Sequence, residues 1–184
     1  MPKKFEYVAD LGAYNGDTIR EILEYSPNVK AITAFEPDRR NFKKLSDLAA
    51  SAKNFSVVPV NAAAWCEDTV LSFADSGNRN SGAFAKGRRV DVQALTLDGV
   101  LSGERVDYIK YDVEGAEAEA LHGSRETILA HHPTILLSAY HRSEDIFSLP
   151  LQMHELDGGY SLYYRRYPYV PAWDLNLFCV YSSK

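Results

Sequence analysis

The feature that most constrains the fold is a regular alternation of strand and helix patterns along the first third of the chain. Short β-rich runs cover residues 5–11, 31–35 and 55–60. Between them, apolar residues recur at helical spacing after Asp17 and after Pro37-Asp38. Each such helix must cross one face of the sheet, so the strands lie parallel with right-handed crossovers. The pattern predicts a doubly wound α/β fold, and the 184 residues fit one domain.

The last part of the chain repeats this alternation and then departs from it. The expected elements, in order, are a strand at 106–111, a helix at 116–130, a strand at 134–139, a helical face at 146–156, and strands at 160–165 and 175–181. Pro150 interrupts the helical face and predicts a kink or a restart. No helix pattern separates the last two strands, so we expect an antiparallel hairpin at the end of a mostly parallel sheet.

A polar loop interrupts the alternation in the middle of the chain. Extended segments at 70–73 and 90–95 flank residues 75–89, which are rich in Gly, Ser and Asn. Loops of this length inside compact domains are usually functional lids or disordered segments. We expect a lid over a bound substrate, with polar contacts from Asn78, Asn80 and Ser81.

Charge and hydropathy exclude several classes of partner. The formal net charge of -5 opposes attraction to nucleic acid or to an anionic membrane surface. The longest apolar runs, such as 134–139, fall far short of the ~20 residues of a membrane-spanning helix. No leader pattern precedes the first strand, so we expect a cytoplasmic protein. Cys66 and Cys179 are too few for a metal cluster or a disulfide framework.

The loop between the first strand and the first helix is the expected cofactor site, because doubly wound folds bind ligands there. Gly12 allows a tight turn, and Gly16 allows close approach of the backbone to a ligand. Glu36 closes the second strand roughly 20 residues further on, where an acid can accept hydrogen bonds from both ribose hydroxyls. The expected cofactor contacts are Asp10, Gly12, Ala13, Tyr14, Gly16, Asp17, Thr18, Glu36 and Pro37.

The glycine spacing and the charge of the loop favour one cofactor over another. Gly12 and Gly16 do not form the G-x-G-x-x-G turn that brings a helix N-terminus onto a pyrophosphate, as in NAD sites. Asp10 and Asp17 would repel a pyrophosphate and attract the ammonium and sulfonium groups of S-adenosylmethionine. We therefore expect S-adenosylmethionine, with NAD as the alternative.

A second motif carries a resemblance to a known family. Asp112-Val113-Glu114-Gly115-Ala116-Glu117 follows a predicted strand, and D-V-E-G-x-E in this position resembles the FkbM methyltransferases. The similarity extends to 10–18, to Phe35-Glu36-Pro37 and to 140–145 with the hairpin after it. It implies a seven-stranded class I methyltransferase fold and methylation of a hydroxyl oxygen, typically of a sugar or a secondary metabolite. Many members carry a glutamate at the end of the fifth strand, where this chain has Ser138-Ala139-Tyr140-His141.

Asp112 and His141 are the expected catalytic residues. Asp112 comes just after a strand, so it faces the crevice where it can bind the cofactor's amino group, accept a hydroxyl proton or hold a divalent cation. His141 follows the neighbouring strand and titrates near neutrality, although a hydrogen-bonded structural histidine is an equal alternative. Glu114 could join Asp112 in a cation site of oxygen ligands, but the metal stays unassigned. Glu117 is interpreted as structural, because acids are favoured at helix N-termini.

The remaining expectations concern the adenine and the acceptor. Asn61 and Ala62 follow the third strand and could contact adenine, although simple packing is an equal interpretation. Tyr140 is a possible wall of the acceptor site, beside Glu114. The predicted function is an S-adenosylmethionine-dependent O-methyltransferase acting on a small-molecule hydroxyl. The alternatives are an NAD-dependent oxidoreductase and a non-catalytic S-adenosylmethionine-binding module. Acceptor identity and oligomeric state stay open at this point.

Overall fold

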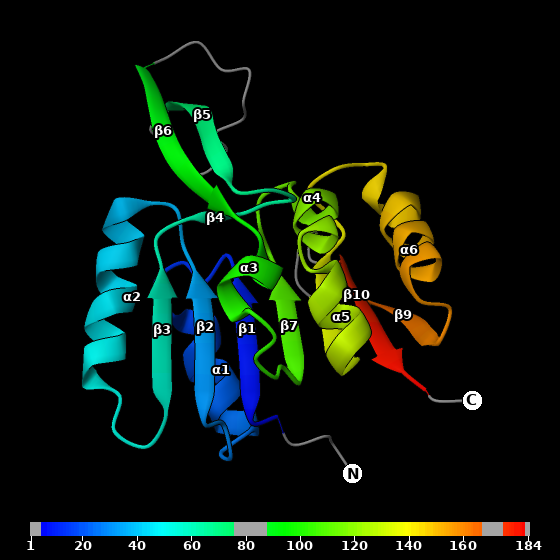
Figure 1. Ribbon diagram of the computed structural model, residues 1–184, viewed down its shortest axis with the longest axis horizontal. Helices are drawn as coiled ribbons and strands as arrows, with labels where there is room; N and C mark the ends of the chain where they lie inside the picture. Colours follow the sequence, from blue (N-terminus) through cyan, green and yellow to red (C-terminus); the bar gives the residue numbers. More distant parts are fainter. Residues whose placement is uncertain (1–4, 76–87, 167–174, 183–184) are drawn as a thin grey trace.

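A computed structural model describes residues 5–75, 88–166 and 175–182 (Figure 1). Its centre is a seven-stranded sheet of order β3-β2-β1-β7-β8-β10-β9. The strands are β1 (Tyr7–Leu11), β2 (Ala31–Phe35), β3 (Ser56–Val60), β7 (Tyr108–Tyr111), β8 (Thr134–Ser138), β9 (Tyr160–Arg166) and β10 (Leu175–Tyr181). Strands β3 to β8 of this order run parallel, and β10 pairs antiparallel with both β8 and β9. The prediction of a mostly parallel sheet with a C-terminal hairpin is confirmed.

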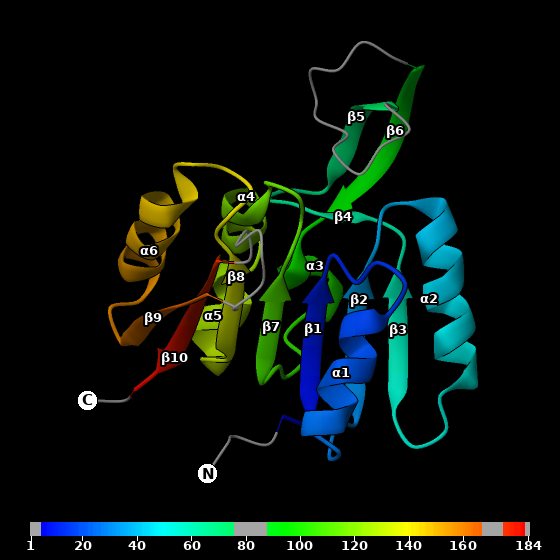
Figure 2. The same ribbon diagram turned by 180° about the vertical axis from the view of Figure 1, so that it is seen from behind.

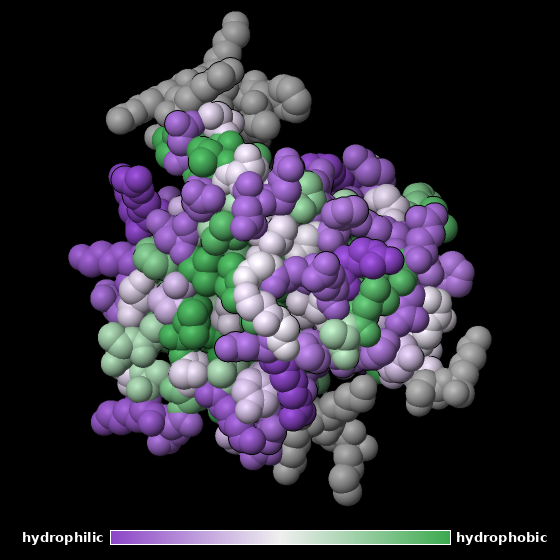
Figure 3. All heavy atoms as spheres, viewed as in Figure 1, coloured by the Kyte–Doolittle hydropathy of each residue, from purple (hydrophilic) through white to green (hydrophobic). Residues whose placement is uncertain are grey.

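Helices lie on both faces of the sheet. Figure 1 shows α3, α4 and α5 in front of it, and Figure 2 shows α1 in front of the opposite face. The helices are α1 (Asp17–Tyr25), α2 (Arg39–Ser51), α3 (Leu97–Leu101), α4 (Glu117–His122), α5 (Arg125–His131) and α6 (Asp145–Leu156). Hydrophilic side chains predominate on the face that carries α3, α4 and α5 (Figure 3). Because helices alternate with the parallel strands along the chain and lie on the faces of the sheet, they form the crossovers that the alternating pattern requires.

Two clusters of buried apolar residues form the core, one on each face. Alternate residues of a strand point to opposite faces, so Leu11 and Ile109 join the cluster beneath α4, α5 and α6. Val8 and Ile32 join the smaller cluster, which includes Ile19 of α1. Burial on both faces explains why the central strands are apolar at almost every position.

The helix expected at 116–130 is broken into two, and this expectation is wrong at its centre. Gly123 ends α4, and a Cβ built on it would lie 1.9 Å from the carbonyl oxygen of Trp65. Close backbone contact therefore separates α4 from α5. The Asp98 carboxylate accepts hydrogen bonds from the backbone of Glu126 and Thr127, which satisfies free N–H groups at the start of α5.

The segment that departs from the alternation forms a small second sheet. It contains β4 (Ala63–Ala64), β5 (Thr69–Asp75) and β6 (Arg88–Leu95), and β5 pairs antiparallel with β6. Figure 1 shows this pair beyond the carboxyl ends of the parallel strands. Asn78, Asn80 and Ser81 lie outside the described residues, so the lid at 75–89 stays a prediction.

Pro150 lies inside α6, which continues through it without a restart. None of the helices in the described part of the chain combines the length and the apolar character needed to cross a membrane.

Candidate active site

The glycine loop lies against the segment that follows β7. Gly12 has φ 89°, and a Cβ on it would lie 2.0 Å from the carbonyl oxygen of Asp112. The backbone N–H groups of Gly12 and Ala13 donate to the carbonyl of Phe35, and that of Asp112 donates to Leu11. Glycine is therefore required at position 12 for two reasons: its backbone is left-handed, and the backbone of Asp112 leaves no room for a Cβ atom. The two sequence motifs are brought together at one edge of the sheet.

Glu36 is a buried acid at the end of β2, with 6% of its surface exposed. Its Oε1 accepts a hydrogen bond of 2.8 Å from the backbone of Asp38. Burial raises the pKa of the Glu36 carboxyl to about 7, against the opposing effect of backbone N–H groups of Asp38 and Tyr14. A carboxylate that loses this much solvation, with no cation among its described contacts, is poised to accept hydrogen bonds from a ligand.

Asn61 supports the position of Glu36. Its side-chain nitrogen donates to the carbonyl oxygens of Glu36, at 2.9 Å, and Pro37, at 3.3 Å. Ala13 and Ala62, expected to touch the cofactor, are fully buried beneath this edge. The structure therefore gives all three residues a packing or bonding role, and their contacts with a cofactor stay predictions.

A buried ion pair lies beneath the loop. The Lys110 Nζ atom is 3.2 Å from Asp10 Oδ1, 3.3 Å from the Gly12 carbonyl and 3.6 Å from Asp112 Oδ2. Burial alone would lower the pKa of Lys110, but the carboxylates of Asp10 and Asp112 outweigh it and raise the pKa. Lys110 is therefore cationic and offsets the charge of Asp10. The expected negative field of the loop is weaker than the sequence indicates, and Asp10 is buried below the surface that a cofactor would touch.

Of the other expected residues of the loop, Tyr14, Asp17 and Thr18 are closer to solvent, whereas Gly16 is buried. Asp17 is exposed at the first position of α1, and its Oδ1 accepts from the backbone of Thr18. Gly16 precedes this helix with φ 80°, and Tyr14 has φ 49°. A left-handed tyrosine is uncommon, so the loop holds an energetically costly conformation.

Asp112 is held by polar groups on both oxygens. Its Oδ1 accepts hydrogen bonds of 3.0 Å from Ser138 Oγ and 3.0 Å from the Tyr140 hydroxyl, while Oδ2 faces Lys110. The side chain is 32% exposed, so an incoming molecule can still reach it. Ser138 and Tyr140 thus lie at the end of β8, where they hold Asp112.

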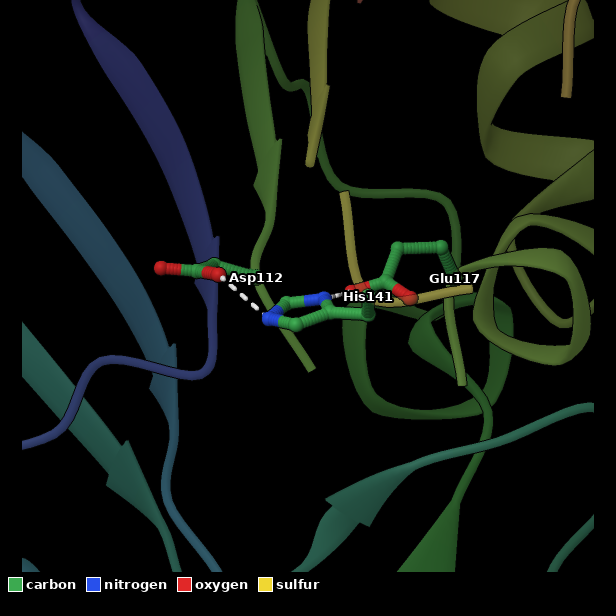
Figure 4. A group of neighbouring side chains, drawn as sticks. All are labelled: Asp112, Glu117 and His141. Carbon is green, nitrogen blue, oxygen red and sulfur yellow. Dashed lines mark hydrogen bonds and ion pairs between the residues drawn. The ribbon is translucent and has the colours of Figure 1, made fainter. Parts of the chain in front are cut away.

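His141 lies beside Asp112 and is oriented by Glu117 (Figure 4). The His141 Nδ1 atom is 2.8 Å from Glu117 Oε1, and its Nε2 is 3.6 Å from both Asp112 Oδ1 and Glu114 Oε2. Burial would lower the pKa of His141, but the hydrogen bond to Glu117 and the nearby acids outweigh it and raise the pKa. A proton on Nδ1 bonds to Glu117, which leaves Nε2 directed at the crevice.

Glu117 does more than stabilise the start of α4, because its carboxylate also holds His141 and the turn before the helix. Its side chain is fully buried, and Oε1 also accepts from the backbone of Val113 at 2.9 Å. The turn before it contains Glu114, with φ 56°, and Gly115, with φ 94°. This left-handed pair turns the chain so that the start of α4 faces the end of β8. The sequence shows no signal for that turn beyond the glycine.

Asp112, Glu117 and His141 offer ligand atoms within 4.8 Å of one another, which is compatible with a metal ion. Glu117 Oε1 and His141 Nδ1 already share a hydrogen bond. A cation held by these two atoms would have to displace the proton between them. The geometry therefore allows either a metal site or a hydrogen-bonded histidine at these two atoms, but not both.

Comparison with known proteins identifies the family. A family model described as the methyltransferase FkbM domain matches residues 10–165. The chain belongs to the FkbM methyltransferase family. No curated protein matches it. Methyltransferase FkbM from Methylobacillus flagellatus KT superposes with a TM-score of 0.77 at 23% identity, over 95% of this chain and 43% of that chain. This FkbM chain therefore spans less than half the length of that relative.

Other solved structures share the fold at lower identity. Fibrillarin from Aeropyrum pernix, in complex with natively bound S-adenosyl-L-methionine, has a TM-score of 0.59 at 15% identity, over 97% of this chain and 67% of that one. A putative O-methyltransferase from Klebsiella pneumoniae has a TM-score of 0.57 at 10% identity, over 97% of this chain and 74% of that one. Together with the sheet order, these matches show the class I methyltransferase fold.

Proposed function

We propose that this FkbM domain binds S-adenosylmethionine over the Gly12 loop and methylates a hydroxyl oxygen of a small-molecule acceptor. The observation that carries the proposal is the placement of His141, oriented by Glu117, beside Asp112 and next to that loop. Family membership supports methyl transfer, and a fibrillarin of the same fold is known with the cofactor bound. The net charge of -5 favours a small acceptor over RNA.

The residues at the edge of the sheet fit this cofactor. Glu36 is buried and without a cationic neighbour among its described contacts, so it would accept hydrogen bonds from the ribose hydroxyls. Gly12 leaves open backbone where a side chain would collide with Asp112. Asp17 and Glu114 are exposed acids that would attract a cationic sulfonium. When bound, the cofactor supplies an electrophilic methyl group.

His141 is proposed as the general base, because an alcohol is a poor nucleophile at neutral pH. Its Nε2 accepts the proton that the acceptor oxygen loses as this oxygen gains the methyl group and the carbon–sulfur bond breaks. Glu117 fixes the tautomer through Nδ1–H and stabilises the imidazolium that forms. Deprotonation of the imidazolium by solvent completes the cycle.

Asp112 is proposed to position the acceptor hydroxyl. Ser138, Tyr140 and Lys110 restrain its two oxygens, so the carboxylate has a fixed orientation. A fixed acceptor aligns the hydroxyl oxygen for in-line attack, and such positioning acts mainly in the transition state.

The test is turnover by two variants on a verified acceptor. A panel of sugars and hydroxylated metabolites is screened first, by release of S-adenosylhomocysteine. Asp112→Asn and His141→Ala are then expected to lower turnover by ~100- to 10,000-fold while cofactor affinity changes little. The wild-type rate should rise with pH through the pKa of His141, and this inflection should vanish in His141→Ala. Near-normal turnover by both folded variants would place the catalytic centre elsewhere.

A further inference from the structure

Half of one sheet face carries no helix in the described part of the chain. Strand pairing places five side chains in one row across the sheet: Asp10, Lys110, Leu136, Phe178 and Tyr163. Side chains in one such row point to the same face. Figure 2 shows α1 in front of β1 and β2, whereas no described helix lies in front of β7, β8 or β10. Sheets with parallel strands are normally covered on both faces.

A groove of about 490 Å³ follows the part of this face that no described helix covers, and it reaches the candidate active site. Asp112, Ser138 and Tyr140 line one part of it. Its apolar walls come from the sheet and from α1, through Tyr108, Leu136, Phe178, Ile22 and Tyr25. The volume lies in the range of pockets that hold metabolite-sized ligands. The groove is therefore continuous with the residues that would contact the reacting hydroxyl.

The charges along the groove restrict what it can hold. Of the lining residues that the structure describes, the charged ones are Glu21, Lys110 and Asp112, and Lys110 is already engaged by Asp10 and Asp112. Among the described lining residues, a phosphate or a carboxylate would meet two acids and no cation that is available to it. Burying an unpaired anion beside acids is costly, whereas an apolar group gains from the aromatic and aliphatic walls.

We propose that this groove binds the uncharged, apolar part of the methyl acceptor, with the acceptor hydroxyl at Asp112. The inference rests on the proposed function, because it takes the Asp112 end as the site of transfer. It narrows the acceptor class to amphiphilic hydroxylated molecules, such as a glycoside with an alkyl or aromatic group. It disfavours sugar phosphates and nucleotide sugars. The walls then act by burying apolar surface, so affinity depends on the length of the apolar group.

The test measures binding of methyl, butyl and hexyl β-D-glucoside by calorimetry, with S-adenosylhomocysteine present. Complete burial of a methylene is worth about four-fold in affinity, so we expect a rise of about two- to four-fold per methylene in the wild type. Leu136→Thr, which introduces a β-branched residue that favours a strand, should flatten this dependence. Tyr25→Ser should also weaken it and carries little risk to folding, since Tyr25 is 79% exposed.

Phe147→Ser is the matched control, because Phe147 is an exposed aromatic of α6, 73% exposed, that does not line the groove. It should keep the wild-type dependence on chain length. Hexyl phosphate should bind at least about ten-fold more weakly than hexyl glucoside. Equal affinity along the series, or unchanged dependence in both groove variants, would overturn the proposal.

Three outcomes separate this inference from its competitors. If S-adenosylhomocysteine binds but the glucosides show no dependence on chain length, the groove assignment fails and the proposed function stands. If the glucosides bind with the expected dependence on chain length but S-adenosylhomocysteine does not bind, the cofactor assignment fails instead. A second copy of the chain could also occupy the groove on this face. Light scattering that shows a dimer in the wild type and a monomer in Tyr25→Ser would support that occupant and contradict the acceptor groove.

Discussion

Replacing the buried acid Glu36 by glutamine should change how stability depends on pH. Its pKa is about 7 in the folded protein and 4.5 ordinarily, so the folded state binds the proton more tightly. The contribution of Glu36 to the free energy of unfolding is therefore present in full below pH 4.5 and is lost as the pH rises toward 7. The shift corresponds to a loss of up to about 3 kcal/mol in the free energy of unfolding. Glu36→Gln has no titrating proton, and its amide oxygen can still accept from Asp38.

Urea unfolding across this pH range provides the assay. Relative to Glu36→Gln, the wild type should lose up to about 3 kcal/mol between acid and neutral pH. Glu24→Gln, which removes an exposed acid of α1, serves as the control and should follow the wild type. Parallel pH profiles for wild type and Glu36→Gln would refute the reasoning, because they would mean that burial does not perturb this carboxyl.

The same variant tests the ribose contact. If the ionised carboxylate accepts hydrogen bonds from the ribose hydroxyls, affinity for S-adenosylhomocysteine should rise with pH through about 7 in the wild type. Glu36→Gln should weaken this affinity by about 1 to 3 kcal/mol and remove its pH dependence. Unchanged affinity in a folded variant would exclude Glu36 from the cofactor site.

Three further predictions address the loop and the histidine. Glu117→Gln removes the negative charge that raises the pKa of His141. The inflection of the pH–rate profile should therefore move to lower pH, and the maximal rate should fall. An unchanged inflection would contradict this electrostatic role of Glu117. Gly12→Ala should lower thermal stability more than Gly103→Ala does. Both glycines have a left-handed backbone, which costs a side chain about 1–2 kcal/mol, but only Gly12 lies against another segment of the chain. Equal losses of stability would contradict the packing argument. A chelator should leave turnover unchanged if Glu117 and His141 keep their hydrogen bond, whereas loss of activity that Mg²⁺ or Mn²⁺ restores would assign a metal to Asp112 and its neighbours.

The fold could be predicted from the sequence because its determinants are local. Strand and helix patterns, with no helix pattern in the sequence between the last two strands, were enough to predict a mostly parallel sheet closed by a hairpin. The break at Gly123 was missed because it depends on the distant carbonyl of Trp65. Sequence spacing carries no information about such a contact between segments that are far apart in the chain.

The candidate site was only partly predictable, for the same reason. Asp112 and His141 follow neighbouring parallel strands, so their proximity could be inferred. The bond between Glu117 and His141 depends on a left-handed turn, and the charge of Lys110 matters only because β1 and β7 are adjacent in register. The individual roles of these residues in binding and catalysis stay predictions.

Calorimetric titration of the purified protein with S-adenosylmethionine, S-adenosylhomocysteine and NAD tests the central claim most directly. Both sulfur compounds should bind at one site per chain, and Glu36→Gln should weaken both, while NAD should give no heat of binding because the loop lacks a pyrophosphate turn. Binding of NAD without binding of either sulfur compound would contradict the account.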